Sequence, residues 1–448
     1  MNCGGQGIYL YFLARELTRL GIEVDVVVGP PYPDPMPFAR SVERVPNQEH
    51  WARWFTRDYA GMLPEGRPTA ALHPLNLYEL GASRLGFLPE PMAFSLRAFR
   101  CMARRLREGE RWDLVHDVQC LGYGVLGLRA LGMPVVTTIH HPLTVDRRAS
   151  LIRDETFRDR IGSMAFYPVG MQAWVARRID RVFTSSEESA RTIAAAFRVP
   201  PHRIRNVLNG LDTDFYKPDG RIQKNETELL CVGRASDPNK GIRNLIRSLA
   251  QMPEELTLTL VDNDHPDNDV FKWAREAGVA HRLTVTGREE SEALVRLYPQ
   301  AALTLVPSRY DGFGLPAVES MACGTPVVAC RAGALPEVMA LCDGGTLVDK
   351  DSPEALAAGV RALQTRNNPE CGVLTPAEAA EHGFVTLRHE EAWLRELARA
   401  ALYLSFVGVL PGYVSTSLLA SSCQSEICSA TFASAGGAAR GLFCFQHL

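Results

Sequence analysis

DGFGLPAVESMACGTPVV, residues 311–328, combines a glycine-containing turn, a short helix and a buried strand. Gly312 and Gly314 lack a Cβ atom, so a ligand can approach the backbone closely. The helix that follows leaves free N–H groups at its amino end, where an anion is stabilised. Asp311 and Glu319 flank this helix start, and carboxylates there can accept hydrogen bonds from sugar hydroxyls. The pattern predicts a nucleotide-sugar site; the alternative is an ordinary loop, helix and strand with two solvated acids.

The same residues resemble the E-x7-E motif of the retaining glycosyltransferases of family 4, written EGFGLPxxEAMAxGxPV, with Asp311 in place of the first glutamate. By this resemblance, Asp311 contacts hydroxyls of the donor sugar and Glu319 holds the ribose. The resemblance also implies that the backbone around Gly312, from Phe313 through Gly314 to Leu315, approaches the sugar and the phosphates. Because aspartate is one methylene shorter than glutamate, the substitution leaves the identity of the donor sugar open.

Length and composition favour a two-domain enzyme without a metal site. A chain of 448 residues exceeds the usual size of one domain. Its net charge of −3 argues against a nucleic-acid binder. The 11 cysteines form no CxxC pairs or clusters with histidine, which indicates neither a zinc site nor a disulfide framework. With no signal peptide in the sequence, we expect a cytoplasmic protein.

Short apolar runs alternate with segments of helical period, the pattern of parallel sheets with crossover helices. We expect an α/β fold of two doubly wound domains, with the ligand at the carboxyl ends of the strands. The resemblance names this fold GT-B, two Rossmann-like domains facing across a cleft. The expected strands span 23–28, 113–118, 134–139 and 181–184 in one domain, and 228–233, 256–261, 282–286, 302–306 and 327–330 in the other.

The turn sequence Asn209–Asp212 is the predicted domain boundary. Residues 1–208 are then an acceptor-side domain and residues 209–385 a nucleotide-sugar-binding domain. By the resemblance, residues 386–405 form a crossover helix. Residues 406–448 are an atypical tail of low charge.

Two cations and a histidine are expected to complete the site. Arg234 and Lys240 flank a loop after a strand, and together they can neutralise a diphosphate, the role that the resemblance also implies. Five residues separate them, one more than the commonest spacing. His140 ends a buried strand and matches the family histidine beside the donor sugar, where it would support charge at the reacting carbon. The alternatives are two solvated cations and a loop-end histidine capped by backbone.

Both ends of the chain are unusual. Gly5 and Gly7 lie in a GGQG segment at a helix start, which suits phosphate or sugar, but only three residues precede that segment. The first strand of the first domain is therefore missing, and we expect unpaired neighbouring strands and a true start upstream. Residues 400–448 contain only Glu426 and Arg440 among charged residues. A membrane span over 400–419 and a poorly ordered or frame-altered tail are the alternatives.

The predicted helix before the strand at 113–118 is rich in arginine. This pattern indicates either a helix face in contact with water or peripheral contact with the inner face of an anionic membrane. The residues concerned are Arg97, Arg100, Arg104, Arg105, Arg107 and Arg111. Membrane contact would fit a lipid-linked acceptor.

These observations predict a retaining hexosyltransferase that uses a UDP- or GDP-linked sugar as co-substrate and needs no cofactor or metal. The sequence leaves the acceptor unknown; a lipid-linked molecule and a glycan are the two candidates. No carboxylate pair is arranged for double displacement, so the return-side mechanism implied by the resemblance is expected. The alternatives are a GT-B phosphorylase or nucleotide-sugar epimerase, and a catalytically silent nucleotide-sugar-binding protein.

Overall fold

The computed structural model describes residues 4–30, 32–46, 72–154, 156–212, 215–287, 289, 291–341, 344–365 and 440–445. Two units are distinguished, and each is described by itself. The first contains Met1–Thr184, Ala190–Val207 and the carboxy-terminal strand. The second contains Ser185–Ser189 and the segment that begins at Leu208. The predicted crossover helix at 386–405 and the predicted membrane span at 400–419 lie outside the described residues.

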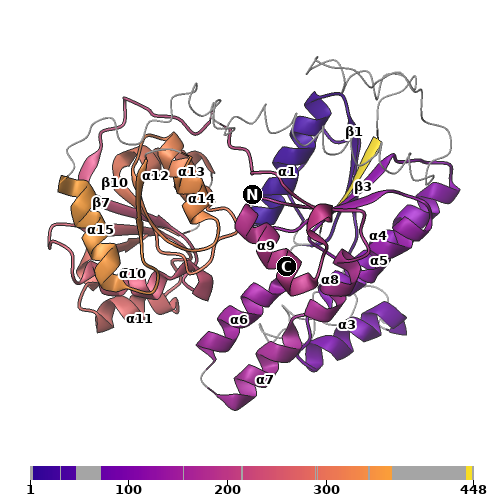
Figure 1. The fold of residues 1–448 in the computed structure, drawn as a ribbon, viewed down its shortest axis with the longest axis horizontal. Coiled ribbons are helices and arrows are strands. Elements are labelled where there is room, and N and C mark those ends of the chain that lie inside the picture. The colour runs from indigo at the N-terminus through magenta and orange to yellow at the C-terminus, as the bar shows by residue number, and fades with distance from the viewer. Residues whose placement is uncertain are drawn as a thin grey trace. The chain divides into compact units, whose positions relative to one another are not determined.

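The first unit is built on a parallel sheet with the strand order β2-β1-β13-β3-β4-β5-β6 (Figure 1). Its strands are β1 (Glu23–Val28), β2 (Ser41–Arg44), β3 (Leu114–Val118), β4 (Val135–Thr138), β5 (Arg181–Thr184), β6 (Ile204–Asn206) and β13 (Arg440–Phe445). Its helices are α1 (Gly4–Arg19), α3 (Pro74–Arg84), α4 (Glu90–Arg107), α5 (Tyr123–Ala130), α6 (Leu143–Arg153), α7 (Phe157–Phe166), α8 (Val169–Ala176) and α9 (Glu187–Phe197).

Helices cover both faces of this sheet, and its strands are apolar on both sides for that reason. Val27 faces a core shared with α4, α5 and α8, whereas Val26 and Val28 face a second core shared with Leu10 and Leu17 of α1. The near-continuous run EVDVVV therefore reads as a buried parallel strand.

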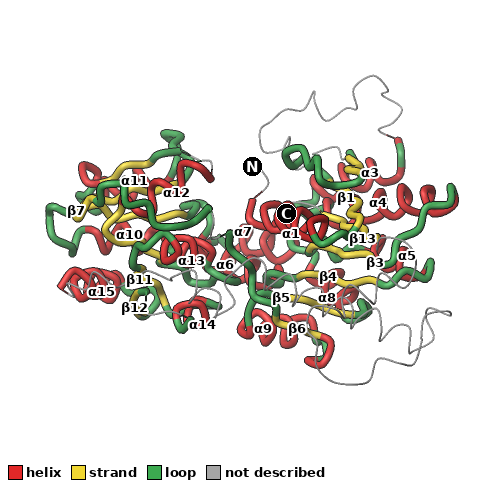
Figure 2. Tube along the Cα trace, turned by 90° about the horizontal axis from the view of Figure 1, so that it is seen from above, coloured by secondary structure: helices red, strands yellow, loops and turns green. Residues whose placement is uncertain are grey.

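The second unit is built on a parallel sheet with the order β12-β11-β10-β7-β8-β9, whose strands are yellow in Figure 2. Its strands are β7 (Asn225–Val232), β8 (Thr257–Val261), β9 (Leu283–Val285), β10 (Ala301–Val306), β11 (Val327–Cys330) and β12 (Gly345–Val348). Its helices are α10 (Ile242–Leu249), α11 (Asp269–Glu276), α12 (Ser291–Gln300), α13 (Leu315–Ala322), α14 (Leu335–Met339) and α15 (Pro353–Thr365). The chain order reverses between β7 and β10, which is where doubly wound sheets bind ligands.

Every expected strand is confirmed, and β1, β5 and β11 have the expected bounds. The strand expected before α1 is absent from the described residues, but β1 and β3 are not left unpaired as the sequence suggested. The carboxy-terminal strand β13 lies between them, bonded to both. The tail therefore contains at least one ordered element.

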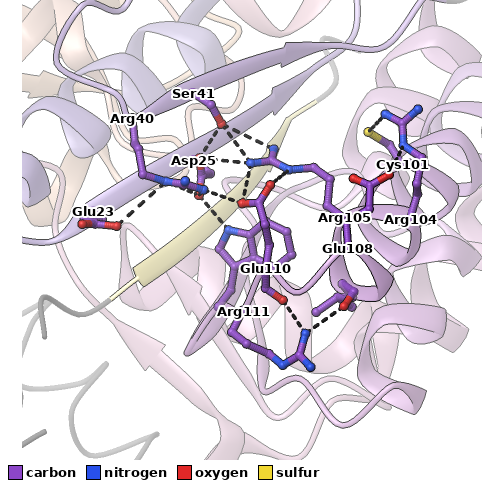
Figure 3. A network of polar contacts seen from close by, with 12 residues as sticks. Glu23, Asp25, Arg40, Ser41, Cys101, Arg104, Arg105, Glu108, Glu110 and Arg111 are labelled. Atoms are coloured by element: carbon purple, nitrogen blue, oxygen red, sulfur yellow. Dashed lines mark hydrogen bonds and ion pairs between the residues drawn. The ribbon is translucent and has the colours of Figure 1, made fainter.

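Asp25, in the middle of β1, is the centre of a polar network that joins the sheet to α4 (Figure 3). Its fully buried carboxylate accepts hydrogen bonds from Arg40, Ser41 and Trp112 Nε1, the last at 2.8 Å. Burial alone would raise the pKa of this carboxyl, but its donors outweigh burial and lower the pKa. The network stabilises a charge in the core because the Arg40 guanidinium and two neutral donors, Ser41 and Trp112, satisfy the carboxylate.

The arginine-rich helix is α4, and its arginines are engaged within the molecule. Arg97 makes a forked contact with Glu79, and Arg105 with Glu110. The others contact His73, Glu108 or backbone carbonyl groups. Within the residues that the structure describes, no helix is long and apolar enough to cross a bilayer.

Candidate functional site

Two loops meet at the carboxyl ends of β7 and β10 in the second unit. The loop after β7 ends in a one-turn helix, Pro238–Lys240, and the loop after β10 leads to α13. The N–H of Arg309 donates to the carbonyl of Asn239 at 2.7 Å. Gly241 has φ +67°, and a Cβ atom there would lie 2.1 Å from the carbonyl oxygen of Pro307. Only glycine allows the two loops to come this close.

This close approach places Lys240 against Asp311. Lys240 Nζ lies 2.8 Å from Asp311 Oδ2, and only 11% of the Asp311 side chain is exposed. Burial alone would raise the pKa of the Asp311 carboxyl, but the Lys240 ammonium lowers it. Burial would lower the pKa of Lys240, but Asp311 raises it. Both groups therefore remain charged at neutral pH, as a pair at the switch point of the sheet.

Asp311 is also held through its backbone and its second oxygen. The N–H of Ala334 donates to the Asp311 carbonyl at 2.9 Å, and the N–H of Phe313 donates to Oδ1 at 3.3 Å. Gly333 has φ +54°, and a Cβ atom there would lie 2.0 Å from the Asp311 backbone oxygen. The carboxylate is thus fixed in position before any ligand binds.

Helix α13 begins directly after Gly314, where the sequence predicted a helix start. Gly314 is the N-cap with φ 91°, Leu315 begins the helix, and Pro316 occupies its first turn. Gly312 accepts hydrogen bonds at its carbonyl from Ser185 and Ser186, at 3.2 and 3.1 Å, which orient the turn. These two serines belong to the same unit by contact and were not expected from the sequence.

Arg234 follows β7 on the same side of the sheet and is exposed. Its positive charge acts on Lys240, whose pKa it lowers slightly against the larger effect of Asp311. Gly233 lies beside the Lys240 stem, since a Cβ atom there would be 3.6 Å from Lys240 Cβ. The two predicted cations are therefore neighbours, one paired and one facing solvent.

Glu319, in α13, is held by two tyrosines that the sequence analysis missed. The Tyr298 hydroxyl donates to Glu319 Oε2 at 2.6 Å, and Tyr216 also bonds to the carboxylate. Burial raises the pKa of Glu319 against the lowering effect of both hydroxyls. Tyr298 is fully buried. The sequence indicated only that it lies on the apolar face of a helix.

A second polar cluster lies in the first unit around His140, just after β4. The Tyr9 ring meets the His140 ring edge-on, with centroids 4.7 Å apart. Gln119 Oε1 accepts from the His140 N–H at 2.7 Å. Within the described residues, His140 Nε2 is buried with no hydrogen-bond partner. Burial lowers the His140 pKa to about 3, so the imidazole is neutral and available for hydrogen bonding.

Asp117, at the end of β3, borders this cluster. Its Oδ2 accepts from Leu121 N and Thr137 Oγ1, at 3.1 and 2.9 Å, while Oδ1 is buried without a partner among the described residues. Burial raises its pKa to about 7. Gln119 and Leu121 both have positive φ, 56° and 50°, which L-residues adopt at a cost. The strained turn and the unpartnered oxygen make this strand end a candidate part of the site.

Gly5 and Gly7 do not form a loop before α1, as the sequence suggested, but lie in its first turn. Gly5 is the second residue of α1, so its N–H has no intrahelical acceptor and can face a ligand. Gly7 is the fourth residue, whose N–H is the first to bond within the helix, so only its missing Cβ atom favours close approach. Within the described ranges, no group of three or more His, Cys, Asp and Glu is arranged to hold a metal ion.

The structure thus brings together Arg234, Lys240, Asp311 and Glu319, with the backbone of Gly312 to Leu315, in the second unit. His140, Gly5 and Gly7 lie in the first unit.

Two family models match this chain, and together they span both units. The model described as Glycosyltransferase Family 4 matches residues 3–215. The model described as Glycosyl transferases group 1 matches residues 212–371. The second match includes Arg234, Lys240, Asp311 and Glu319.

Among similar proteins is the MMP alpha-(1->4)-mannosyltransferase of Mycolicibacterium hassiacum, 36% identical over 341 residues, which cover 75% of this chain and 80% of that protein. The D-inositol 3-phosphate glycosyltransferase of Mycobacterium marinum is 27% identical over 398 residues, 85% of this chain and 78% of that protein. The Anabaena protein HepE, solved in complex with UDP and glucose, shares the fold with a TM-score of 0.60 at 17% identity, over 88% of this chain and 96% of that one.

Proposed function

Because this chain belongs to the family 4 glycosyltransferases of the GT-B fold, we propose that it moves a hexosyl group from a nucleotide diphosphate sugar to an acceptor hydroxyl with retention of the anomeric configuration. The observation that carries the proposal is the Lys240–Asp311 pair at the switch point of the second sheet, 2.8 Å across. It lies next to an exposed arginine and a helix start, which together suit a diphosphate with a sugar attached.

In this proposal the positive groups bind the diphosphate. Arg234 is exposed and can form a forked contact with phosphate oxygens. Lys240 adds a compact charge, and the N–H groups at the start of α13 add the helix dipole. These groups stabilise the charge that develops on the leaving diphosphate, so we propose that the reaction proceeds without a metal ion.

Asp311 and Glu319 bind the two sugars of the donor. Asp311 is fixed by Lys240 and by Phe313 N–H, and its remaining lone pairs can accept hydrogen bonds from hydroxyls of the transferred sugar. Glu319 is fixed by Tyr298 and accepts from the ribose hydroxyls. A carboxylate tied to an ammonium and a backbone N–H is a weak nucleophile, so we assign Asp311 to binding.

Retention then requires that the acceptor attack from the face that the diphosphate leaves. The bond between the anomeric carbon and the phosphate oxygen breaks, the acceptor oxygen bonds to that carbon, and the acceptor proton passes to the departing phosphate. His140 supports the positive charge on the sugar, because its imidazole is neutral and its Nε2 has no partner among the described residues. At the start of α1, Gly5 contributes a free backbone N–H, and Gly7, which has no Cβ atom, leaves room for the donor.

The relative at 36% identity is named a mannosyltransferase, and a structural neighbour was solved with UDP and glucose. We therefore propose mannose and glucose as the donor sugars to test first, on both UDP and GDP. A sugar or sugar phosphate hydroxyl is the proposed acceptor.

Protection against thermal unfolding tests the donor assignment directly. The full chain is heated with UDP, GDP and their mannose and glucose esters, each at the same concentration. One nucleotide and its sugar ester should raise the midpoint by several degrees, since a ligand at about 100 times its Kd adds roughly 2.7 kcal/mol. Failure of every nucleotide and nucleotide sugar to shift the midpoint would contradict the proposal.

A further inference from the structure

The carboxy-terminal strand β13 occupies the centre of the first sheet. It runs parallel to β1, with pairs from Glu23↔Arg440 to Val28↔Phe445, and parallel to β3, with pairs from Gly441↔Leu114 to Phe445↔Val118. In Figure 1 this strand is yellow and lies between the indigo and purple strands β1 and β3. Hydrogen bonding on both edges makes it an interior strand of the sheet.

The place of β13 in the strand order is the place that the first strand occupies in a doubly wound domain. The usual doubly wound order is 3-2-1-4-5-6, with the strand that precedes the glycine turn in the centre. The observed order is β2-β1-β13-β3-β4-β5-β6, so β13 lies where strand 1 belongs and α1 is the helix that should follow it. The second unit has the same order with β7, its first strand, in that place.

Phe443 connects this strand to the polar cluster around His140. Its side chain is 2% exposed, and its ring centroid lies 5.2 Å from that of His116. His116 Nε2 lies 2.8 Å from Thr138 Oγ1, which lies 3.2 Å from the Tyr9 hydroxyl. Tyr9 in turn packs against His140. Four consecutive contacts thus run from the carboxy-terminal strand to the proposed catalytic histidine.

We propose that β13 serves as the first strand of the acceptor-side domain, and that Phe443 is a positioning residue for the Tyr9–His140 pair through His116 and Thr138. The part of the proposal that concerns catalysis rests on the proposed function of His140; the part that concerns the strand does not.

The strand assignment is tested by moving the strand. In one variant residues 440–448 are deleted. In a second variant the same residues are moved to a position directly before Met1, so that residues 446–448 and 1–3 connect the strand to α1. We expect the deletion to lower the thermal midpoint by at least 10 °C, and the fusion to restore it to within a few degrees of the parent. An unchanged midpoint on deletion, or a fusion no more stable than the deletion, would overturn the assignment.

The positioning role is tested with Phe443→Ala against Phe94→Ala. Phe94 is 1% exposed in the same unit but packs in the core on the other face of the sheet, so it is a control of equal type and burial. Imidazole signals of the full chain are followed by NMR as a function of pH. Burial by the Phe443 ring helps to hold the pKa of His116 at about 3. In Phe443→Ala, and not in Phe94→Ala, this pKa should rise towards 6.5. The His140 signal should shift in the same variant.

Phe443→Leu, which keeps an apolar cover, should give both signals close to those of the parent. Equal changes in the two alanine variants, or no change in either, would overturn the positioning role. If Phe443→Ala is too unstable to record, the smaller truncation Phe443→Val replaces it, and a shift of the His116 signal without one of His140, or no shift of either, would overturn the role. None of these readouts requires turnover, so a failure here is distinguishable from a failure of the proposed function. With the preferred donor, Phe443→Ala should lower kcat at least tenfold and leave KM for the nucleotide sugar within threefold.

Discussion

Removing Lys240 is the perturbation whose effect can be worked out most fully from the structure. In Lys240→Met the stem is retained and the charge is lost, which leaves Asp311 as an unpaired carboxylate with 11% of its side chain exposed. Breaking a fully buried pair costs about 3–5 kcal/mol and an exposed pair about 0–1 kcal/mol. Because 29% of the Lys240 side chain is exposed, we expect an intermediate loss of roughly 2–3 kcal/mol.

A double-mutant cycle isolates the pair. Asp311→Asn and the double variant are compared with Lys240→Met in urea unfolding, and we expect a coupling energy of about 1–2 kcal/mol. Activity with the preferred donor should fall by roughly 10²–10³ in Lys240→Met, as for loss of one group that stabilises the leaving charge. The exposed pair of Arg309 and Asp351 is the control, and Asp351→Asn should cost less than about 1 kcal/mol. Additive losses from Lys240→Met and Asp311→Asn would refute the reasoning.

Other variants test the neighbouring contacts. In Gly333→Ala the new methyl group would lie 2.0 Å from the Asp311 backbone oxygen, so donor affinity measured by titration calorimetry should fall at least tenfold. The control Gly278→Ala, at a similar φ but in open space, should leave donor affinity unchanged. Equal effects of the two substitutions would contradict the role of Gly333. In the parent, Asp117 should make stability fall as pH rises from about 4 to about 7, because the folded state keeps the Asp117 proton that the unfolded chain releases. The buried neutral His116 and His140, with pKa values of about 3, act in the opposite direction up to about pH 6.5, so the measured quantity is the change of slope on substitution. In scanning calorimetry Asp117→Asn should therefore gain more stability than the parent as pH rises over this range, and an unaltered pH dependence would show that Asp117 does not contribute to it. Glu319→Gln should weaken nucleotide and nucleotide sugar equally, by roughly tenfold in a binding titration, since both carry the ribose; a loss confined to the sugar ester would reassign this residue.

The second domain was largely predictable because its signals are local. β7, β10 and the start of α13 are marked by apolar runs that end in glycine, cations or acids, and parallel strand ends converge at one edge of a sheet. That convergence is why residues as distant in sequence as Lys240 and Asp311 were expected at one site. Their direct ion pair depends on side-chain geometry and on Gly241, which periodicity does not reveal.

The contacts that the sequence did not reveal depend on long-range packing. Tyr298 looked like any apolar residue of a helix face, and only the fold directs its hydroxyl to Glu319. Asp117 lies near the end of β3 and Gln119 follows that strand, but neither residue belongs to a sequence motif. The pairing of Arg440 with Glu23 joins positions at opposite ends of the chain, and the short run RGLFCF contains no information about its partner.

The central claim, that the second domain binds a nucleotide sugar with Asp311 on the sugar, is tested most directly by titration calorimetry of the parent and of Asp311→Asn. Each is titrated with the preferred nucleotide diphosphate and with its sugar ester, and Asp349→Asn, an exposed carboxylate of the same unit, serves as the control. We predict that Asp311→Asn binds the nucleotide with an affinity within about threefold of the parent but loses at least tenfold, about 1.4 kcal/mol, for the sugar ester. An equal loss for both ligands would contradict the claim.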